Sequence, residues 1–289
     1  MNQKLLTVIV FSFLIQTQLF SQNNISLAKL WELDQGISTP ESVIFDNTRN
    51  CLYISNFNDK TGFRNRQDTL LDEYLSKVDL EGKLIEQKWV NGLLGPTGMM
   101  IHNDTLYVVE RGYLSKIDID KQTIVERLPI SGTKFLNDIV IDKNGDIYIS
   151  DTKKEGTIFK ISKGKCEAWY SDSLIQNCNG LFLDDDQLIM GTRGRTSLVS
   201  ISINDKTTKV LTSKIADGID GLKKYGKDFI VSWRYEILAV NQNGDSFLLE
   251  DSSDKKDWNA DIELIESKDM IIVPTLLTNK LIAYKVDVR

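Results

Sequence analysis

The chain has 289 residues and a formal net charge of −6, with 35 Lys and Arg against 41 Asp and Glu. A mildly acidic chain without basic runs is poorly suited to bind nucleic acid or an anionic membrane surface. Three scattered cysteines (Cys51, Cys166 and Cys178) do not make a disulfide framework, and the single histidine, His102, excludes a multi-histidine zinc site.

The first residues predict a secretory signal peptide. Lys4 precedes an apolar run from Leu5 to Ile15, and the small residue Ser21 follows at the expected cleavage point. The run is too short to cross a membrane as a helix, so we expect no membrane span. We therefore predict a signal peptide over 1–21, a single domain over 22–289, and export to the periplasm or the medium.

Six hairpin units follow along the chain, and each begins with a polar pair before two short apolar runs joined by a turn. The pairs are Glu41-Ser42, Thr97-Gly98, Asn137-Asp138, Asn179-Gly180, Asp220-Gly221 and Ala260-Asp261. Their second residues lie 56, 40, 42, 41 and 40 residues apart. A period near 40 with four short strands per unit is typical of a β-propeller.

The last unit lacks a fourth strand, and the segment before the first unit, 27–34, has the alternation of a strand. We predict that this segment completes the last blade and closes the ring, because closure removes unpaired strand edges. The predicted fold is an all-β, six-bladed propeller of four-stranded blades. The expected blades are 38–91, 95–131, 135–173, 176–214, 218–252, and 257–288 together with 27–34.

The inner strand of every propeller blade lines a central channel, so the polar pairs should converge at one end of it. Antiparallel pairing brings the loops between second and third strands to the same mouth. Those loops carry basic and aromatic side chains, which predict a mouth that binds an anionic or hydroxyl-rich small molecule. These residues are Arg64, Arg66, Arg111, Arg193, Trp233 and Arg234.

Glu41, Asn137, Asn179 and Asp220 supply an all-oxygen set at the head of four inner strands. Two carboxylates about 5 Å apart repel by roughly 3 kcal/mol at an effective dielectric of about 20, so a cation between them is favoured. Such a set suits Ca²⁺ best and Mg²⁺ next. The alternative is structural, because Asn and Asp before a strand are common turn caps.

At these residues the chain resembles the senescence-marker-protein and gluconolactonase family of calcium-dependent six-bladed propellers. Glu41 in Glu-Ser-Val-Ile-Phe is similar to the family's Glu-Gly-Pro-Val-Trp, and the pairs at Asn137, Asn179 and Asp220 are similar to its Asn-Asp-Gly, Asn-Gly and Asp-Gly. The resemblance implies a metal held by Glu41, Asn179 and Asp220. It also implies that Asn137 contacts metal or substrate and that Asp220 is the general base.

The resemblance further implies that the long first-unit loop, 56–73 with Arg64 and Arg66, is a lid over the channel. It leaves the metal open among Ca²⁺, Mg²⁺, Zn²⁺ and Mn²⁺, with Ca²⁺ the first expectation. The chain departs from the family at Phe135, where a substrate-binding Arg often stands. Thr97 replaces the channel His of the related paraoxonases.

The leading functional hypothesis is hydrolysis of a lactone, such as an anionic sugar lactone, with Asp220 as catalytic base. The expected substrate contacts are Asn137, Thr97, Arg111, Arg193, Trp233 and Arg234. A second hypothesis is a non-catalytic periplasmic propeller that binds a ligand or a protein, which Phe135 favours. A third is a phosphotriesterase-like or strictosidine-synthase-like activity on the same scaffold.

Overall fold

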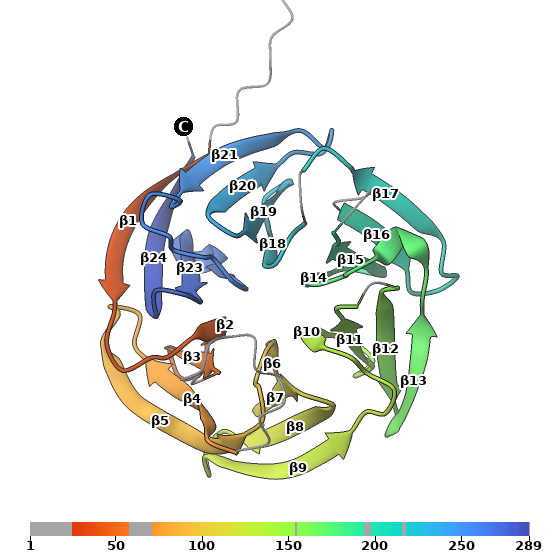
Figure 1. The fold of residues 1–289 in the computed structure, drawn as a ribbon, viewed down its shortest axis with the longest axis horizontal. Coiled ribbons are helices and arrows are strands. Elements are labelled where there is room, and N and C mark those ends of the chain that lie inside the picture. Colours follow the sequence, from red (N-terminus) through yellow and green to blue (C-terminus); the bar gives the residue numbers. More distant parts are fainter. Residues whose placement is uncertain (1–24, 58–70, 154, 194–197, 216–217, 289) are drawn as a thin grey trace, which may run out of the picture.

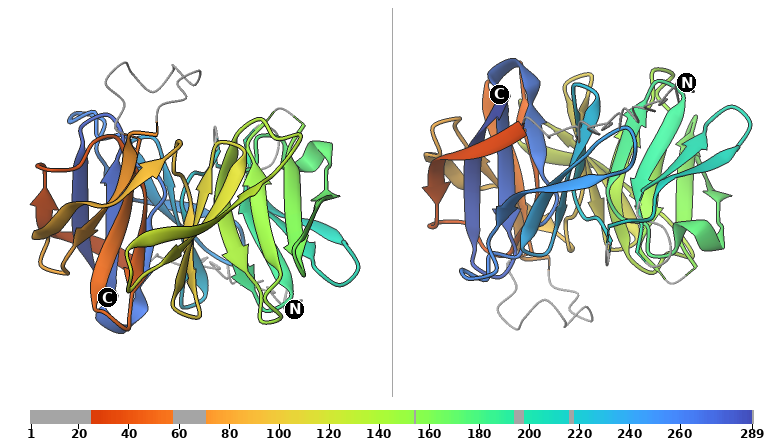
Figure 2. Two further views of the ribbon diagram at one scale, coloured as in Figure 1. Left: turned by 90° about the horizontal axis from the view of Figure 1, so that it is seen from below. Right: turned by 90° about the horizontal axis from the view of Figure 1, so that it is seen from above.

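A computed structural model describes residues 25–57, 71–153, 155–193, 198–215 and 218–288. Six four-stranded antiparallel sheets stand as blades around a central channel (Figure 1). Seen from the side, the molecule is a disc one blade deep (Figure 2). The predicted six-bladed propeller is confirmed. The predicted signal peptide, 1–21, and the lid residues Arg64 and Arg66 lie outside the described residues.

Each blade runs in chain order from an inner strand beside the channel to an outer strand at the rim. Blade one comprises β2 (Pro40–Asp46), β3 (Cys51–Asn56), β4 (Glu73–Val78) and β5 (Leu84–Leu93). Blade two comprises β6 (Met99–His102), β7 (Thr105–Glu110), β8 (Tyr113–Asp118) and β9 (Thr123–Pro129). Blade three comprises β10 (Leu136–Ile141), β11 (Ile147–Asp151), β12 (Thr157–Ser162) and β13 (Lys165–Tyr170).

Blade four comprises β14 (Leu181–Asp184), β15 (Gln187–Gly191), β16 (Leu198–Ser202) and β17 (Thr208–Thr212). Blade five comprises β18 (Leu222–Tyr225), β19 (Asp228–Trp233), β20 (Glu236–Val240) and β21 (Ser246–Asp251). Blade six comprises β22 (Glu263–Ile265), β23 (Met270–Thr275), β24 (Lys280–Val288) and β1 (Ile25–Leu33). The helices of the described chain are the short 3₁₀ turns η1 (Ser173–Ile175) and η2 (Glu266–Lys268), and neither is long enough to cross a membrane.

The N-terminal strand closes the ring as predicted. β1 pairs antiparallel with β24, from Ile25 opposite Val288 to Leu33 opposite Leu281. The indole N–H of Trp31 donates to the carbonyl of Leu80, at 2.8 Å, and so ties the sixth blade to the first. Both chain ends are therefore held in one sheet, and the ring has no open seam between its first and last blades.

Apolar side chains fill the space between neighbouring blades. Between blades one and two, for example, the rings of Tyr53 and Trp89 stack with centroids 4.1 Å apart, and Leu75 and Leu106 are fully buried beside them. Full burial of one such side chain contributes about 1.5–3 kcal/mol. These packed interfaces make the blades a rigid support for the residues at the channel.

In blades one and three the polar pair lies where the inner strand bulges, and in the other blades it directly precedes that strand or lies a few residues before it. The register between β2 and β3 shifts between Pro40 and Ser42, and β10 has the same irregularity after Leu136. A bulge frees a backbone N–H, and a serine of the second strand accepts it. The three bonds run from the N–H of Ser42 to Ser55 Oγ (2.9 Å), Asp138 to Ser150 Oγ (3.0 Å) and Gly221 to Ser232 Oγ (2.8 Å).

Candidate functional site

The inner strands approach one another closely because three of the pairs end in glycine. A Cβ at Gly98 would lie 2.7 Å from the carbonyl oxygen of Asn137, and one at Gly180 would lie 2.0 Å from that of Asp220. Real Cβ contacts are never so short, so a side chain at either position would push two blades apart. Glycine therefore allows adjacent pairs to meet around the channel.

Where the second residue of a pair is polar, it links blades by a hydrogen bond instead. Ser42 Oγ donates to Asp261 Oδ2 at 2.9 Å, which joins blades one and six. The backbone N–H of Leu181 donates to Asp138 Oδ2 at 2.6 Å, which joins blades three and four. The pairs thus link neighbouring blades at the heads of the inner strands, and we call them together the belt.

Asp220 and Asn179 are in direct contact within this belt. Asn179 Nδ2 donates to Asp220 Oδ1 at 2.7 Å, and Asp220 is only 8% exposed. Burial, reinforced by the nearby charge of Asp261, raises the pKa of Asp220 to about 7, although the Asn179 hydrogen bond opposes the rise. The structure therefore brings the predicted base and one predicted metal ligand together.

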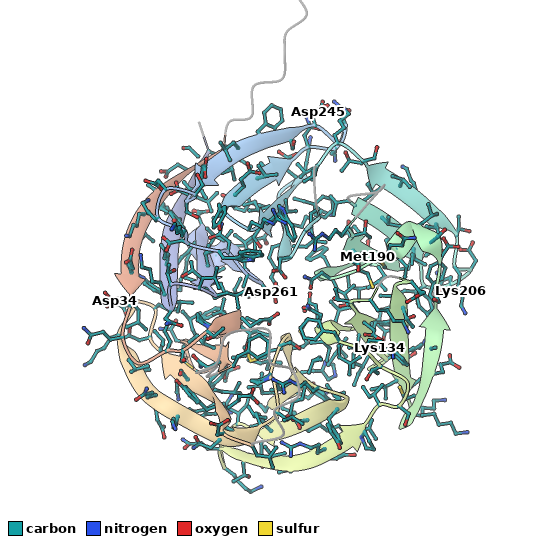
Figure 3. All side chains as sticks on the ribbon, in the orientation of Figure 1. Asp34, Lys134, Met190, Lys206, Asp245 and Asp261 are labelled. Atoms are coloured by element: carbon teal, nitrogen blue, oxygen red, sulfur yellow. The ribbon has the colours of Figure 1, made fainter. Side chains whose placement is uncertain are left out.

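Asp261 also belongs to this site, although sequence reasoning gave it no chemical role. It lies beside the channel (Figure 3), and its backbone N–H donates to the carbonyl of Glu41 at 3.0 Å. Burial raises the pKa of Asp261, while Lys223 and the Ser42 hydroxyl counteract that rise. The sixth pair begins with Ala260, so its acidic second residue did not match the pattern of the predicted ligands.

Lys223 is the cation that balances the inner carboxylates. Its Nζ lies 3.2 Å from Glu263 Oε2. Burial lowers the pKa of Lys223, but the charges of Glu263, Asp261 and Asp138 outweigh it and raise the pKa overall. Asp138 has its own pKa raised well above the usual range by burial and by the charge of Asp261. Lysine and glutamate occupy the same repeat position in adjacent blades, which is the sequence signal for this ion pair.

Some oxygen atoms of the belt have no hydrogen-bond donor within the described part of the protein. Asn179 Oδ1 and Asp261 Oδ1 are buried without a hydrogen-bond partner among the described residues. The described chain has no group of three or more His, Cys, Asp or Glu side chains placed to hold a metal. A cation here would accordingly need the amide oxygens of Asn137 and Asn179 beside the carboxylates of Glu41 and Asp220, a hard donor set suited to Ca²⁺.

Aromatic rings and guanidinium groups stack at the mouth above the belt. The Cζ atoms of Arg193 and Arg234 lie 5.1 and 5.0 Å from the ring centroid of Trp233. Arg234 also lies 5.5 Å from the ring of Trp258, which packs edge-on against the rings of both Trp233 and Tyr235. Neither Trp258 nor Tyr235 was predicted. Tyr235 follows Trp233 by two residues, which was the available signal, whereas Trp258 is connected with Trp233 only in space. Arginines stacked in this way present their edges to an anion or a hydroxyl group.

Phe135 takes part in an apolar cluster at the same mouth, which shares Trp258 with the stacked rings. The cluster contains buried Phe57, Ala260 and Leu276, with Phe135 and Trp258 packed against it. Its members come from blades one, three and six, so it gathers residues from different sides of the ring. Phe135 is thus a packing residue, in a position that does not favour charge.

Thr97 and Arg111 have structural partners in the folded chain. Thr97 is fully buried, and its hydroxyl is 3.3 Å from the carbonyl oxygens of both Val109 and Leu136. Arg111 Nη2 lies 3.3 Å from Glu73 Oε1 and bridges blades one and two. Of the predicted substrate contacts, Arg193, Trp233 and Arg234 are thus grouped together, whereas these two residues hold blades to one another.

The comparisons with known proteins agree on the fold. No family model and no curated protein sequence matches the chain. A gluconolactonase from Xanthomonas campestris is similar in structure, with a TM-score of 0.69 and 12% identity over 90% of this chain and 89% of that one. A calcium-binding regucalcin from Agrobacterium tumefaciens has a TM-score of 0.67 and 12% identity, over 91% of this chain and 95% of that one. A chain of a nidogen–laminin complex has a TM-score of 0.56 and 16% identity, over 72% of this chain and 79% of that one. The chain therefore has the propeller fold seen in gluconolactonase and regucalcin. This is the fold that the sequence of its repeated pairs predicted.

Proposed function

We propose that this propeller is a divalent-metal-dependent hydrolase that opens a lactone or a similar cyclic ester. The observation that carries the proposal is the contact between Asn179 and Asp220, which holds a buried carboxylate with a pKa of about 7 at the channel belt. A general base works best when its pKa lies near the operating pH. The gluconolactonase of the same fold supports the choice of substrate class.

The side chains of the belt and of the mouth have different roles in the proposed reaction. Asn179 fixes the orientation of Asp220, whose carboxylate takes a proton from the attacking water. Arg193 and Arg234 bind a carboxylate or hydroxyl group of the substrate, and Trp233 packs on its ring face. Water adds to the ester carbon, the ring C–O bond breaks, and the proton passes to the leaving alkoxide to give a hydroxy acid.

Glu41, Asn137, Asn179 and Asp220 are the residues that would hold the metal, for which Ca²⁺ is the first choice. When bound, such a cation supplies polarisation of the ester carbonyl and stabilises negative charge on its oxygen. The calcium-binding regucalcin of the same fold supports this assignment.

The test is a pH-indicator assay with sugar and aliphatic lactones, in calcium and in chelator. Asp220→Asn keeps the shape of the side chain and is expected to lower turnover about a hundredfold or more, because a general base contributes that much. The matched control is Asp245→Asn at the outer rim (Figure 3), which should retain full activity. Unchanged turnover in Asp220→Asn would contradict the mechanism, provided that both variants keep the same circular dichroism spectrum.

A second candidate is a non-catalytic propeller that binds a ligand or a protein. The apolar cluster around Phe135 favours it, because an apolar side chain occupies the position where a charged side chain would bind a sugar acid. A chain from the nidogen–laminin complex, which shares the fold, also supports it. This candidate predicts no lactone hydrolysis at any metal concentration and unchanged ligand binding in Asp220→Asn.

A further inference from the structure

The channel has a second opening, at the end opposite to the belt and the arginine-lined mouth. A cavity of about 770 Å³ lies there, and its wall comes from the far halves of the six inner strands and from the turns that follow two of them. We call it the rear cavity. Its volume lies within the range of small-molecule sites, about 300–1,000 Å³.

Blades one to four give the rear cavity an apolar wall. The wall residues include Phe45, Met100, Ile101, Ile141, Phe182 and Leu183, all of them partly exposed. Phe182 stands edge-on to Phe229, with centroids 6.3 Å apart, and is thereby fixed in place. Large apolar side chains left open to water in one concave site are characteristic of a ligand-binding surface.

Blades five and six give the cavity a charged wall. Lys223 is paired with Glu263, at 3.2 Å, and Lys224 is paired with Asp184, at 2.6 Å. Glu266, at the rim, is exposed and has no ion-pair partner among the described residues. The two lysines are therefore already neutralised, whereas Glu266 offers a carboxylate at this wall that is still able to pair with a cation.

The turns around the rear opening extend the negative charge. The six turns that join first and second strands contain seven acidic and four basic residues. These turns are 47–50, 103–104, 142–146, 185–186, 226–227 and 266–269. The mouth at the other end carries Arg193 and Arg234, so the two ends of the channel present opposite charges. A ring of like charge around a low-dielectric cavity concentrates ions of the opposite sign.

We propose that the rear cavity binds a small organic cation with an apolar body, such as an arylalkyl amine. The apolar wall of blades one to four takes the body, and the acidic rim at Glu266 takes the ammonium group. The phenyl faces of Phe45 and Phe182 add attraction for the cation where it passes them. This site does not depend on the proposed lactone hydrolysis, because it shares no residue with the belt.

The experiment is isothermal titration calorimetry of the folded protein at pH 7 with 3-phenylpropylamine and 3-phenylpropionate. These probes match in size and differ in charge. We expect the amine to bind about tenfold more tightly than the carboxylate, or better. Equal affinities, tighter binding of the carboxylate, or no binding of the amine would overturn the proposal.

Two variants locate the binding. Glu266→Lys reverses the charge at the rim and should weaken amine binding about tenfold, whereas Asp245→Lys makes the same charge change at the outer edge and should leave it unchanged. Ile141→Trp should weaken amine binding, because the larger side chain occupies part of the apolar wall where the probe's ring would pack, and Asp220→Asn should have no effect on it. Unchanged amine affinity in Glu266→Lys or in Ile141→Trp would refute the assignment to the rear cavity.

Discussion

Replacing Lys223 by methionine tests whether one buried cation holds the inner carboxylates together. Blade two has methionine at the equivalent position, Met100, so the substitution suits the strand. Lys223 lies 3.2 Å from Glu263, and the two side chains are 23% and 16% exposed. Breaking a buried pair by removing one partner costs about 3–5 kcal/mol. We expect Lys223→Met to lower the free energy of unfolding by about 3 kcal/mol. This is the lower end of that range, because both side chains retain some contact with water.

The loss of folding stability in Lys223→Met should depend on pH and should be larger at high pH than at low pH. Without the lysine, the folded-state pKa values of Glu263, Asp261 and Asp138 rise further above their unfolded values of about 4. A carboxyl group whose pKa is raised by folding destabilises the folded state above that pKa. Its penalty disappears as the pH falls towards the unfolded value. The deficit should therefore be largest near pH 8 and shrink towards pH 5.

Urea unfolding of wild type and variant at pH 8, 7, 6 and 5 measures this effect. Lys224→Met is the matched control, because its pair with Asp184 is more exposed and a surface pair contributes about 0–1 kcal/mol. The double variant Lys223→Met, Glu263→Leu should regain part of the loss, since it removes one stranded carboxylate. A deficit below about 1 kcal/mol, or one that stays constant from pH 8 to pH 5, would refute the reasoning.

Three further changes test how the blades are joined. Ser232→Ala should cost about 1–3 kcal/mol in urea unfolding, because it strands a buried backbone N–H; a neutral result would exclude a role for the bulge hydroxyl. Gly180→Ala should cost more than about 3 kcal/mol, since its Cβ meets the Asp220 carbonyl, whereas Gly132→Ala in open space should cost about 1 kcal/mol. A chain that starts after β1 should fail to give a folded monomer in gel filtration, and a stable one would show that β1 is dispensable.

The fold could be predicted because each unit repeats the same local signals. Polar pair, apolar run, turn and second run recur at nearly one period, and the unit without an outer strand indicated the closing segment at Leu27. The contact between Asn179 and Asp220 also follows from the repeat, because equivalent residues of adjacent blades must be neighbours. The repeat thus predicts which residues of adjacent blades are neighbours, because their positions along the inner strands are equivalent.

The direction of a side chain was harder to predict than its place in the repeat. Thr97 and Arg111 occur at channel-end positions, yet their polar atoms turn towards carbonyl groups and Glu73 between blades. The cluster of Phe57, Phe135 and Trp258 is equally invisible in sequence, because its members are far apart in the chain and unlike in their repeat positions. Only packing across the ring brings them together.

Lys223 also explains how one channel can hold several buried acids. Asp220 lies just before β18 and Lys223 lies within it, three residues further on, which corresponds to about 10 Å in an extended chain at a rise of roughly 3.3 Å per residue. A cation held by Asp220 would lie too far away to neutralise Glu263, and Lys223 is too far away to neutralise Asp220. The two positions therefore need separate positive charges. The chain provides one of them as a lysine, and the proposed metal would provide the other.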